Sequence, residues 1–176
     1  LGIAGRAMLG AWGALQLAQQ APAFGAGADV RKPNVVLILA DDLGWSDLAC
    51  YGNEFHETPN LDRLAREGMR FTDAHSPSTV CTPSRYSLLT GKMTFRINYR
   101  SVFESVGGPC LIKEDQLTLP QMLRNQGYAT AMTGKWHVTH HTGPNGPKHN
   151  WPLQRGFDRF YGTIQGAGSF YDPACL

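Results

Sequence analysis

The chain has 176 residues, of which 42% are hydrophobic and 17% are charged, and its formal net charge is +2 with histidine neutral. This length and composition suffice for a folded domain with a core, and they exclude an intrinsically disordered protein. The near-neutral charge gives no indication of nucleic acid or a membrane surface as a partner, so we expect no nucleic acid binding and no stable membrane association.

The first 28 residues differ from the rest in composition. Their one charged residue, Arg6, precedes the small and apolar stretch Ala7–Leu15, and the segment ends in Ala26-Gly27-Ala28. This pattern is typical of an export signal, and the apolar stretch is shorter than the about 20 residues of a membrane span. We therefore predict an incomplete signal peptide over residues 1–28 and a secreted or periplasmic mature chain over 29–176. A flexible N-terminal tail or a poor helix is the alternative.

Three apolar runs predict β-strands. Asn34–Ala40 is continuous and rich in β-branched residues, which is typical of a strand buried on both faces in a parallel sheet. Met69–Ala74 and Tyr128–Thr133 are predicted as further strands, the last of them buried. Because helices are predicted between these runs, we expect an α/β fold with a mostly parallel sheet flanked by helices.

Three helices are predicted from residues that commonly begin and end them. The first helix is predicted to begin at Thr58-Pro59 and to end at Gly68. The second begins at Pro83, two residues after Cys81, and ends at Gly91. The third begins at Thr118-Leu119-Pro120 and ends at Gly127. The expected apolar faces are Leu61, Leu64 and Ala65, then Tyr86, Leu88 and Leu89, then Leu119, Met122 and Leu123. Residues 140–151 are rich in Gly, Pro, His and Asn and are predicted to form a loop.

Asp41 and Asp42 follow the first predicted strand directly. Ligands of open α/β sheets bind at the carboxyl ends of strands. Two adjacent carboxylates suit a hard cation such as calcium or magnesium, whereas without a cation they would repel each other. A solvated turn is the alternative, and the buried strand predicted before the pair disfavours it.

Cys81 is followed by Pro83 and Arg85 at the predicted start of a helix. Free backbone N–H groups there attract anions, and a guanidinium fork suits tetrahedral oxyanions. Taken alone, Cys81 is as readily explained as a buried thiol or half of a disulfide. No cysteine pair has C-x-x-C spacing, and the pairing of Cys50, Cys110 and Cys175 stays open.

Lys135 and His137 follow the strand predicted at 128–133. Alternate residues of an extended segment point the same way, so the two side chains can face one pocket with Trp136 packed behind them. A solvated lysine and a structural histidine are the alternatives.

The segment Cys81-Thr82-Pro83-Ser84-Arg85, with Leu88-Leu89-Thr90-Gly91 after it, resembles the signature of the formylglycine-dependent sulfatase family, which belongs to the alkaline phosphatase-like superfamily. The segment 127–137 resembles the family's second signature, and segments 33–44, 58–65 and 155–158 also match its pattern. The similarity covers roughly residues 32–162, with the motifs in the family's order. Thr79 and Thr133 depart from the pattern at positions without a proposed catalytic role.

This resemblance implies a calcium-dependent sulfuric ester hydrolase. Asp41, Asp42 and residue 81 would ligate calcium. Cys81 would be oxidised to formylglycine by a separate formylglycine-generating enzyme that reads the unfolded segment. One hydroxyl of the hydrated aldehyde would attack sulfur and the other would expel sulfate. Arg85, a further catalytic residue, would hold the modified residue 81 in place.

The same resemblance assigns two more catalytic residues, and it implies that further active-site residues lie outside these 176 residues. Lys135 would bind the sulfate ester, and His137 would take up a proton. The family's downstream Asp-Asn pair, second histidine and second lysine are not found in these 176 residues. We therefore expect an N-terminal portion of the catalytic domain that is truncated at the C-terminus and inactive alone, with apolar faces exposed at 35–39 and 128–132.

Two other functions remain as alternatives. One is a phosphodiester or phosphonate monoester hydrolase of the same superfamily, since phosphate and sulfate are both tetrahedral anions. The other is a non-catalytic sulfate-binding module. The substrate is expected to be a sulfate ester, and the histidines and tryptophan of residues 140–151 are compatible with a sulfated carbohydrate, although such residues also serve as plain loop anchors.

Overall fold

The computed structural model describes residues 32–99, 101, 111–169 and 171. The predicted signal segment 1–28, Cys110 and Cys175 lie outside these residues. The chain divides after Ala40 into two units, which we describe separately. Within the described ranges, no helix has the length and apolar character needed to cross a membrane.

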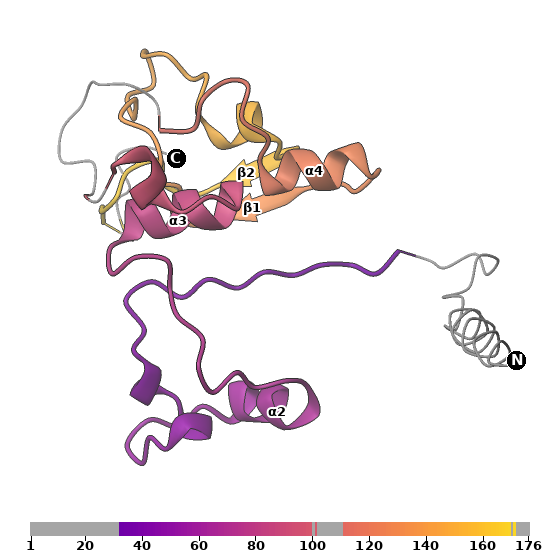
Figure 1. Ribbon diagram of the computed structural model, residues 1–176, viewed down its shortest axis with the longest axis vertical. Helices are drawn as coiled ribbons and strands as arrows, with labels where there is room; N and C mark the ends of the chain where they lie inside the picture. The colour runs from indigo at the N-terminus through magenta and orange to yellow at the C-terminus, as the bar shows by residue number, and fades with distance from the viewer. Residues whose placement is uncertain (1–31, 100, 102–110, 170, 172–176) are drawn as a thin grey trace, which may run out of the picture. The chain divides into compact units, whose positions relative to one another are not determined.

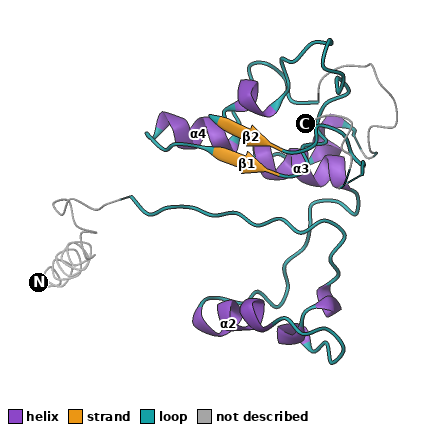
Figure 2. Ribbon diagram, turned by 180° about the vertical axis from the view of Figure 1, so that it is seen from behind, coloured by secondary structure: helices purple, strands orange, loops and turns teal. Residues whose placement is uncertain are grey.

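Residues 32–40, the described part of the first unit, form neither helix nor strand (Figure 2). The side chains from Val35 to Leu39 are 49–83% exposed, so the prediction of a buried strand over Asn34–Ala40 is wrong. A parallel strand takes its hydrogen bonds from neighbouring strands, and no described residue forms a ladder with this segment. The exposure itself agrees with the expectation that the apolar side chains at 35–39 are not covered.

The second unit begins with two short 3-10 helices, η2 (Trp45–Asp47) and η3 (Ala49–Tyr51), and the helix α2 (Pro59–Glu67). Thr58 and Gly68 flank α2, which confirms both predicted boundaries. The apolar residues Leu61 and Leu64 are nevertheless exposed. Met69–Ala74 contains no strand, contrary to prediction.

The helix α3 (Cys81–Thr90) begins at the cysteine itself and ends where predicted, before Gly91 in the left-handed conformation. A short 3-10 helix, η4 (Thr94–Ile97), follows it. Tyr86 and Leu89 are buried in the core, as predicted, whereas Leu88 is 37% exposed. Two of the three residues in the predicted apolar face therefore pack against the interior, and Leu88 does not.

The helix α4 (Leu119–Asn125) begins with a reciprocal cap. The side chain of Gln121 accepts a hydrogen bond from the Thr118 backbone N–H at 3.0 Å, and the Gln121 N–H donates to Thr118 Oγ1 at 3.5 Å. This is the capping box that Thr and Gln form at this spacing. Met122, predicted to face inward, is 45% exposed.

Two parallel strands, β1 (Ala131–Thr133) and β2 (Arg159–Tyr161), form the sheet, with Met132 opposite Phe160 (Figure 1). The parallel pairing agrees with the predicted mostly parallel sheet, although the strand β2 was not predicted. β1 is shorter than the predicted run 128–133, and Met132 is half-buried between the exposed residues Ala131 and Thr133. A 3-10 helix, η5 (Pro152–Arg155), precedes β2. The buried hydrophobic core of the described residues consists of Tyr86, Leu89, Ile112, Trp136, Val138 and Ile164.

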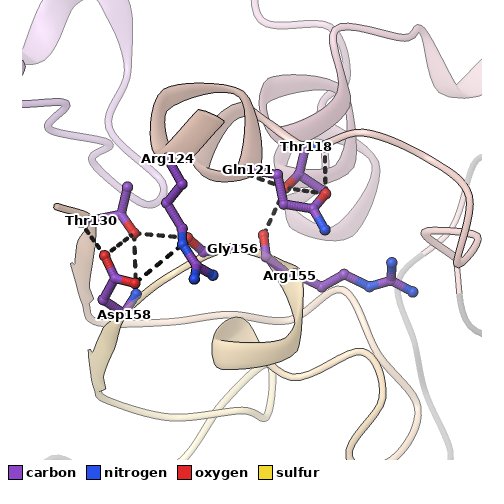
Figure 3. Close-up of polar contacts among 7 residues, drawn as sticks. All are labelled: Thr118, Gln121, Arg124, Thr130, Arg155, Gly156 and Asp158. Atoms are coloured by element: carbon purple, nitrogen blue, oxygen red, sulfur yellow. Dashed lines mark hydrogen bonds and ion pairs between the residues drawn. The ribbon is translucent and has the colours of Figure 1, made fainter. Parts of the chain in front are cut away.

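A polar network joins α4 and β1 to the segment 155–158 (Figure 3). Asp158 accepts hydrogen bonds from the backbone N–H and the hydroxyl of Thr130, and it pairs with Arg124 at 3.2 Å. The Thr130 backbone donor is the main cause that lowers the pKa of Asp158. The hydroxyl of Thr118 donates to the carbonyl of Arg155 at 2.6 Å. Part of the signature at 155–158 therefore holds the sheet to the helix.

Candidate functional site

Cys81 and Arg85 lie one helical turn apart at the start of α3. Cys81 is the first residue of the helix, and its thiol is free and half-buried. Side chains four positions apart are neighbours on a helix, and helical side chains lean toward the N-terminus. The side chains of residues 81 and 85 therefore start from the same face of the helix.

Arg85 connects α3 to two distant segments of the chain. Its Nη1 donates to the carbonyl of Lys135 at 2.6 Å, and its Nη2 lies 3.5 Å from Oδ1 of Asp41. The side chain is 10% exposed, and its buried Nε has no hydrogen-bond partner among the described residues. Because a buried donor without an acceptor is costly, by about 1–3 kcal/mol, this position favours a neighbouring oxygen acceptor.

Asp41 receives both cations of this cluster. Lys135 Nζ donates to its Oδ2 at 2.8 Å, while Arg85 approaches the other oxygen. The Lys135 hydrogen bond is the main cause that lowers the pKa of Asp41, with Arg85 adding to it and partial burial opposing it. Two cations and one carboxylate leave the cluster with a net positive charge, which suits an anionic ligand.

Asp42 and His137 share an uncommon backbone conformation. Their φ angles are +56° and +53°, and Asn98 is the other residue besides glycine with a positive φ in the described ranges. Such conformations are sparsely populated and concentrate at functional sites. Asp42 is exposed, whereas His137 is 6% exposed.

His137 is held by the segment that follows β2. Its backbone N–H donates to the carbonyl of Ile164 at 3.1 Å, and the Trp136 N–H donates to Thr163 at 2.8 Å. The imidazole lies against Gly166, where an added Cβ would be 2.2 Å from Nε2. Gly166 therefore makes room for the ring, a role that a single glycine in a glycine-rich segment does not reveal in sequence.

Trp136, between Lys135 and His137, is anchored by a buried relay. It is 1% exposed, as expected for a residue packed behind the pair. Its indole N–H donates to the carbonyl of Asn150 at 2.8 Å. The side chain of Asn150 accepts from Arg155, whose guanidinium also donates to the carbonyl of Ile112 at 3.0 Å. The sequence motif at 155–158 pointed to this segment but not to this relay.

The predicted calcium ligands are only partly brought together. The carboxylate chemistry of Asp41 and Asp42 suits calcium, but both oxygens of Asp41 face Lys135 and Arg85. Across the part of the chain that the structure describes, no three His, Cys, Asp or Glu side chains form a group able to hold a metal. Because calcium takes six to eight oxygen ligands, the described residues do not form its complete shell. The ligand roles of Asp41, Asp42 and residue 81 stay a prediction.

Comparisons with known proteins agree with the motifs. The profile of the family described as Sulfatase matches residues 33–175. Arylsulfatase G of Mus musculus is 47% identical over 133 residues, which cover 74% of this chain and 24% of that protein.

Solved structures show the same relationship. Ps i-CgsB in complex with k-i-k-neocarrahexaose matches with a TM-score of 0.68 and 34% identity, covering 79% of this chain and 30% of that one. A Bacteroides thetaiotaomicron protein described in the metabolism of multiple glycosaminoglycans matches with a TM-score of 0.62 and 41% identity, covering 74% and 28%. The chain thus spans about a quarter to a third of the length of these relatives, and it belongs to the sulfatase family.

Proposed function

We propose that these residues form the N-terminal part of a sulfuric ester hydrolase that cleaves a sulfate monoester, with Cys81 as the precursor of its nucleophile. One observation carries the proposal: Arg85 and Lys135 converge on Asp41, and Arg85 stands one helical turn after Cys81 on the same helix. Fixed cations at such a place stabilise the negative charge of a sulfuryl transfer. We call the longer protein that includes these residues the full-length enzyme.

Position 81 fits a formylglycine. Cys81 carries a free thiol, and the buried Nε of Arg85 lacks an acceptor among the described residues, which an oxygen-bearing residue at 81 would supply. We propose that a formylglycine-generating enzyme converts Cys81 before folding, because Pro83 and Arg85 of the segment it reads are buried in the folded helix. When hydrated, formylglycine supplies a hydroxyl nucleophile in place of a thiol.

Each remaining residue has a distinct task. Lys135 binds the sulfate ester and offsets charge on its bridging oxygen, while Asp41 orients the ammonium group. Arg85 holds residue 81 and fixes the carbonyl of Lys135. His137, placed by the segment after β2, takes up a proton.

Asp41 and Asp42 contribute carboxylates to a calcium site in the full-length enzyme, and residue 81 contributes an oxygen. Calcium supplies Lewis-acid polarisation of the sulfate oxygens. Because the described residues do not complete a calcium shell, we propose that residues 1–176 alone do not turn over a sulfate ester.

We further propose a sulfated carbohydrate as substrate and export from the cytoplasm. One structural relative was solved with a neocarrahexaose, and another is described in glycosaminoglycan metabolism. The composition of residues 1–28 supports export to a secreted or periplasmic location.

The test compares two tetrahedral esters on the same protein. The full-length enzyme, produced with a formylglycine-generating enzyme and calcium, is assayed side by side on an aryl sulfate and an aryl phosphodiester. We expect kcat/KM to favour the sulfate. A large preference for the diester supports a phosphodiester or phosphonate monoester hydrolase instead, and binding of sulfate without turnover of either ester supports a sulfate-binding module.

A further inference from the structure

The loop 139–151 follows His137 directly and lies in the longest acid-free stretch of the described chain. No Asp or Glu occurs between Asp115 and Asp158. The loop carries His140, His141, Lys148 and His149, together with Trp151. A segment that carries hydrogen-bond donors and a lysine but no carboxylate is suited to anions.

Two tryptophan hydrogen bonds fix this loop. One joins its two ends to each other, and the other joins its C-terminal end to Trp136 in the candidate site. The indole N–H of Trp151 donates to the carbonyl of His141 at 2.6 Å, which closes the loop at its neck. The indole N–H of Trp136 donates to the carbonyl of Asn150 at 2.8 Å, and Trp136 stands between Lys135 and His137. The loop is therefore tied to the residues proposed to bind the sulfate ester.

The loop is close enough to contact the same ligand as the site. His141 is four residues from His137, so their Cα atoms are at most about 14 Å apart even in a fully extended chain. The loop therefore lies within reach of the sugar adjacent to one whose sulfate is held by Lys135.

The polar side chains of the loop are gathered in pairs. Lys148 Nζ lies 5.1 Å from the centre of the Trp151 ring, a cation–π arrangement that restrains the ammonium. The rings of His141 and His149 lie 5.7 Å apart and are tilted by 58°. Lys148 and His149 are exposed, while His141 and Trp151 are half-buried. His141 and Trp151 thus pack beneath the exposed ammonium group of Lys148 and the exposed imidazole of His149.

We propose that Lys148, His149 and His141 form a subsite for a second sulfate group, carried by a sugar neighbouring the one that is desulfated. The proposal rests on the proposed function and narrows its substrate to an oligosaccharide with more than one sulfate. An ammonium and imidazole N–H groups are donors to sulfate oxygens. The ring pair His141 and His149 does not form a metal site with a third His, Cys, Asp or Glu ligand within the described ranges.

The experiment separates the subsite from the reaction. The variant Lys148→Ala/His149→Ala of the full-length enzyme is compared with a matched control, His75→Ala/Lys92→Ala, which removes an exposed histidine and an exposed lysine elsewhere. Substrates are a monosulfated aryl ester and a multiply sulfated carrageenan tetrasaccharide. We expect a loss of about 10-fold in kcat/KM on the tetrasaccharide, the equivalent of one charge-assisted hydrogen bond, through KM alone, and no change on the aryl ester.

Either an unchanged kcat/KM on the tetrasaccharide or an equal loss on both substrates overturns the subsite. If the wild-type protein hydrolyses neither substrate, the proposed function fails, and the subsite is then judged by binding. Retention on immobilised carrageenan, relative to unsulfated agarose, drops in the double variant but not in the control if the subsite exists. Equal retention of both variants contradicts it.

Discussion

Lys135 Nζ lies 2.8 Å from Oδ2 of Asp41, although 94 positions separate the two residues in the chain. The other oxygen of the same carboxylate faces Arg85, which in turn donates to the carbonyl of Lys135. The three residues therefore form a closed triangle built from three distant segments. Since such long-range closure is entropically costly, the triangle exists only when the surrounding fold is formed, and it is a sensitive reporter of that fold.

The triangle predicts an acid-sensitive contribution to stability. The pKa of Asp41 is lowered by Lys135 and Arg85 from 3.8, so its stabilising effect is present above the unfolded pKa and is lost as pH falls through the folded pKa. Compared with Asp41→Asn, the wild-type full-length enzyme, kept free of calcium by a chelator, should be more stable at neutral pH by up to about 1 kcal/mol, allowing for solvent screening. Denaturant unfolding across pH 2–7 measures the difference; a gap that persists at the acidic end contradicts the assignment.

Arg85→Lys should reduce activity beyond its effect on Cys81 conversion. Lysine keeps the charge but loses the fork that reaches both the Lys135 carbonyl and Asp41. We expect kcat to fall by about 10²-fold, the scale of losing one preorganised donor. Because the substitution also alters the segment read by the modifying enzyme, activity is divided by the converted fraction of Cys81 from peptide mass spectrometry. Wild-type turnover per converted enzyme would show that the fork is dispensable.

Gly166→Ala should displace the His137 ring. The added Cβ would be 2.2 Å from Nε2 and 2.3 Å from Cε1 of His137, so the imidazole must move. A misplacement of about 1 Å in a catalytic group costs on the order of 10²-fold in rate. Gly168→Ala is the matched control, because its Cβ meets nothing within 4 Å and it should keep full activity. Equal kcat values for the two alanine variants would remove Gly166 from the account.

The apolar run in the first unit should make the 176-residue chain self-associate. Val36 and Ile38 are 83% and 77% exposed, and contiguous exposed apolar segments of high β-propensity promote association. Val36→Lys/Ile38→Lys should shift the chain from large species toward monomer in analytical ultracentrifugation. The substitutions Glu54→Gln/Glu57→Gln at two exposed positions raise the net charge by the same two units and serve as the control. A monomeric wild-type chain contradicts this prediction.

The helix boundaries could be predicted from residues near each end, whereas the strands depend on contacts with distant parts of the chain. Thr58, Gly68 and Gly91 mark helix ends through their own backbone preferences, so these boundaries could be read from a few residues. A strand needs a partner, and the apolar run 34–40 has none among the described residues. The continuous apolar run therefore predicted a strand that the described residues do not form, because the prediction could not take account of a missing partner strand.

Within the candidate site, too, contacts between neighbours in sequence could be predicted and contacts between distant residues could not. Cys81 and Arg85 share a helix, so their proximity follows from spacing alone. The pairing of Asp41 with Lys135 does not, because sequence reasoning assigned one residue to calcium and the other to sulfate. Gly166 was missed because its role depends on the ring packed against it, and no local pattern records that contact.

The most direct test of the central claim is the mass of the peptide that contains Cys81, taken from the full-length enzyme made in a host with a formylglycine-generating enzyme. We expect a mass loss in which sulfur is replaced by oxygen and two hydrogens are removed, with aryl sulfate turnover that scales with the converted fraction and vanishes in Cys81→Ala. An unmodified thiol at position 81 in an enzyme that still hydrolyses the aryl sulfate would contradict it.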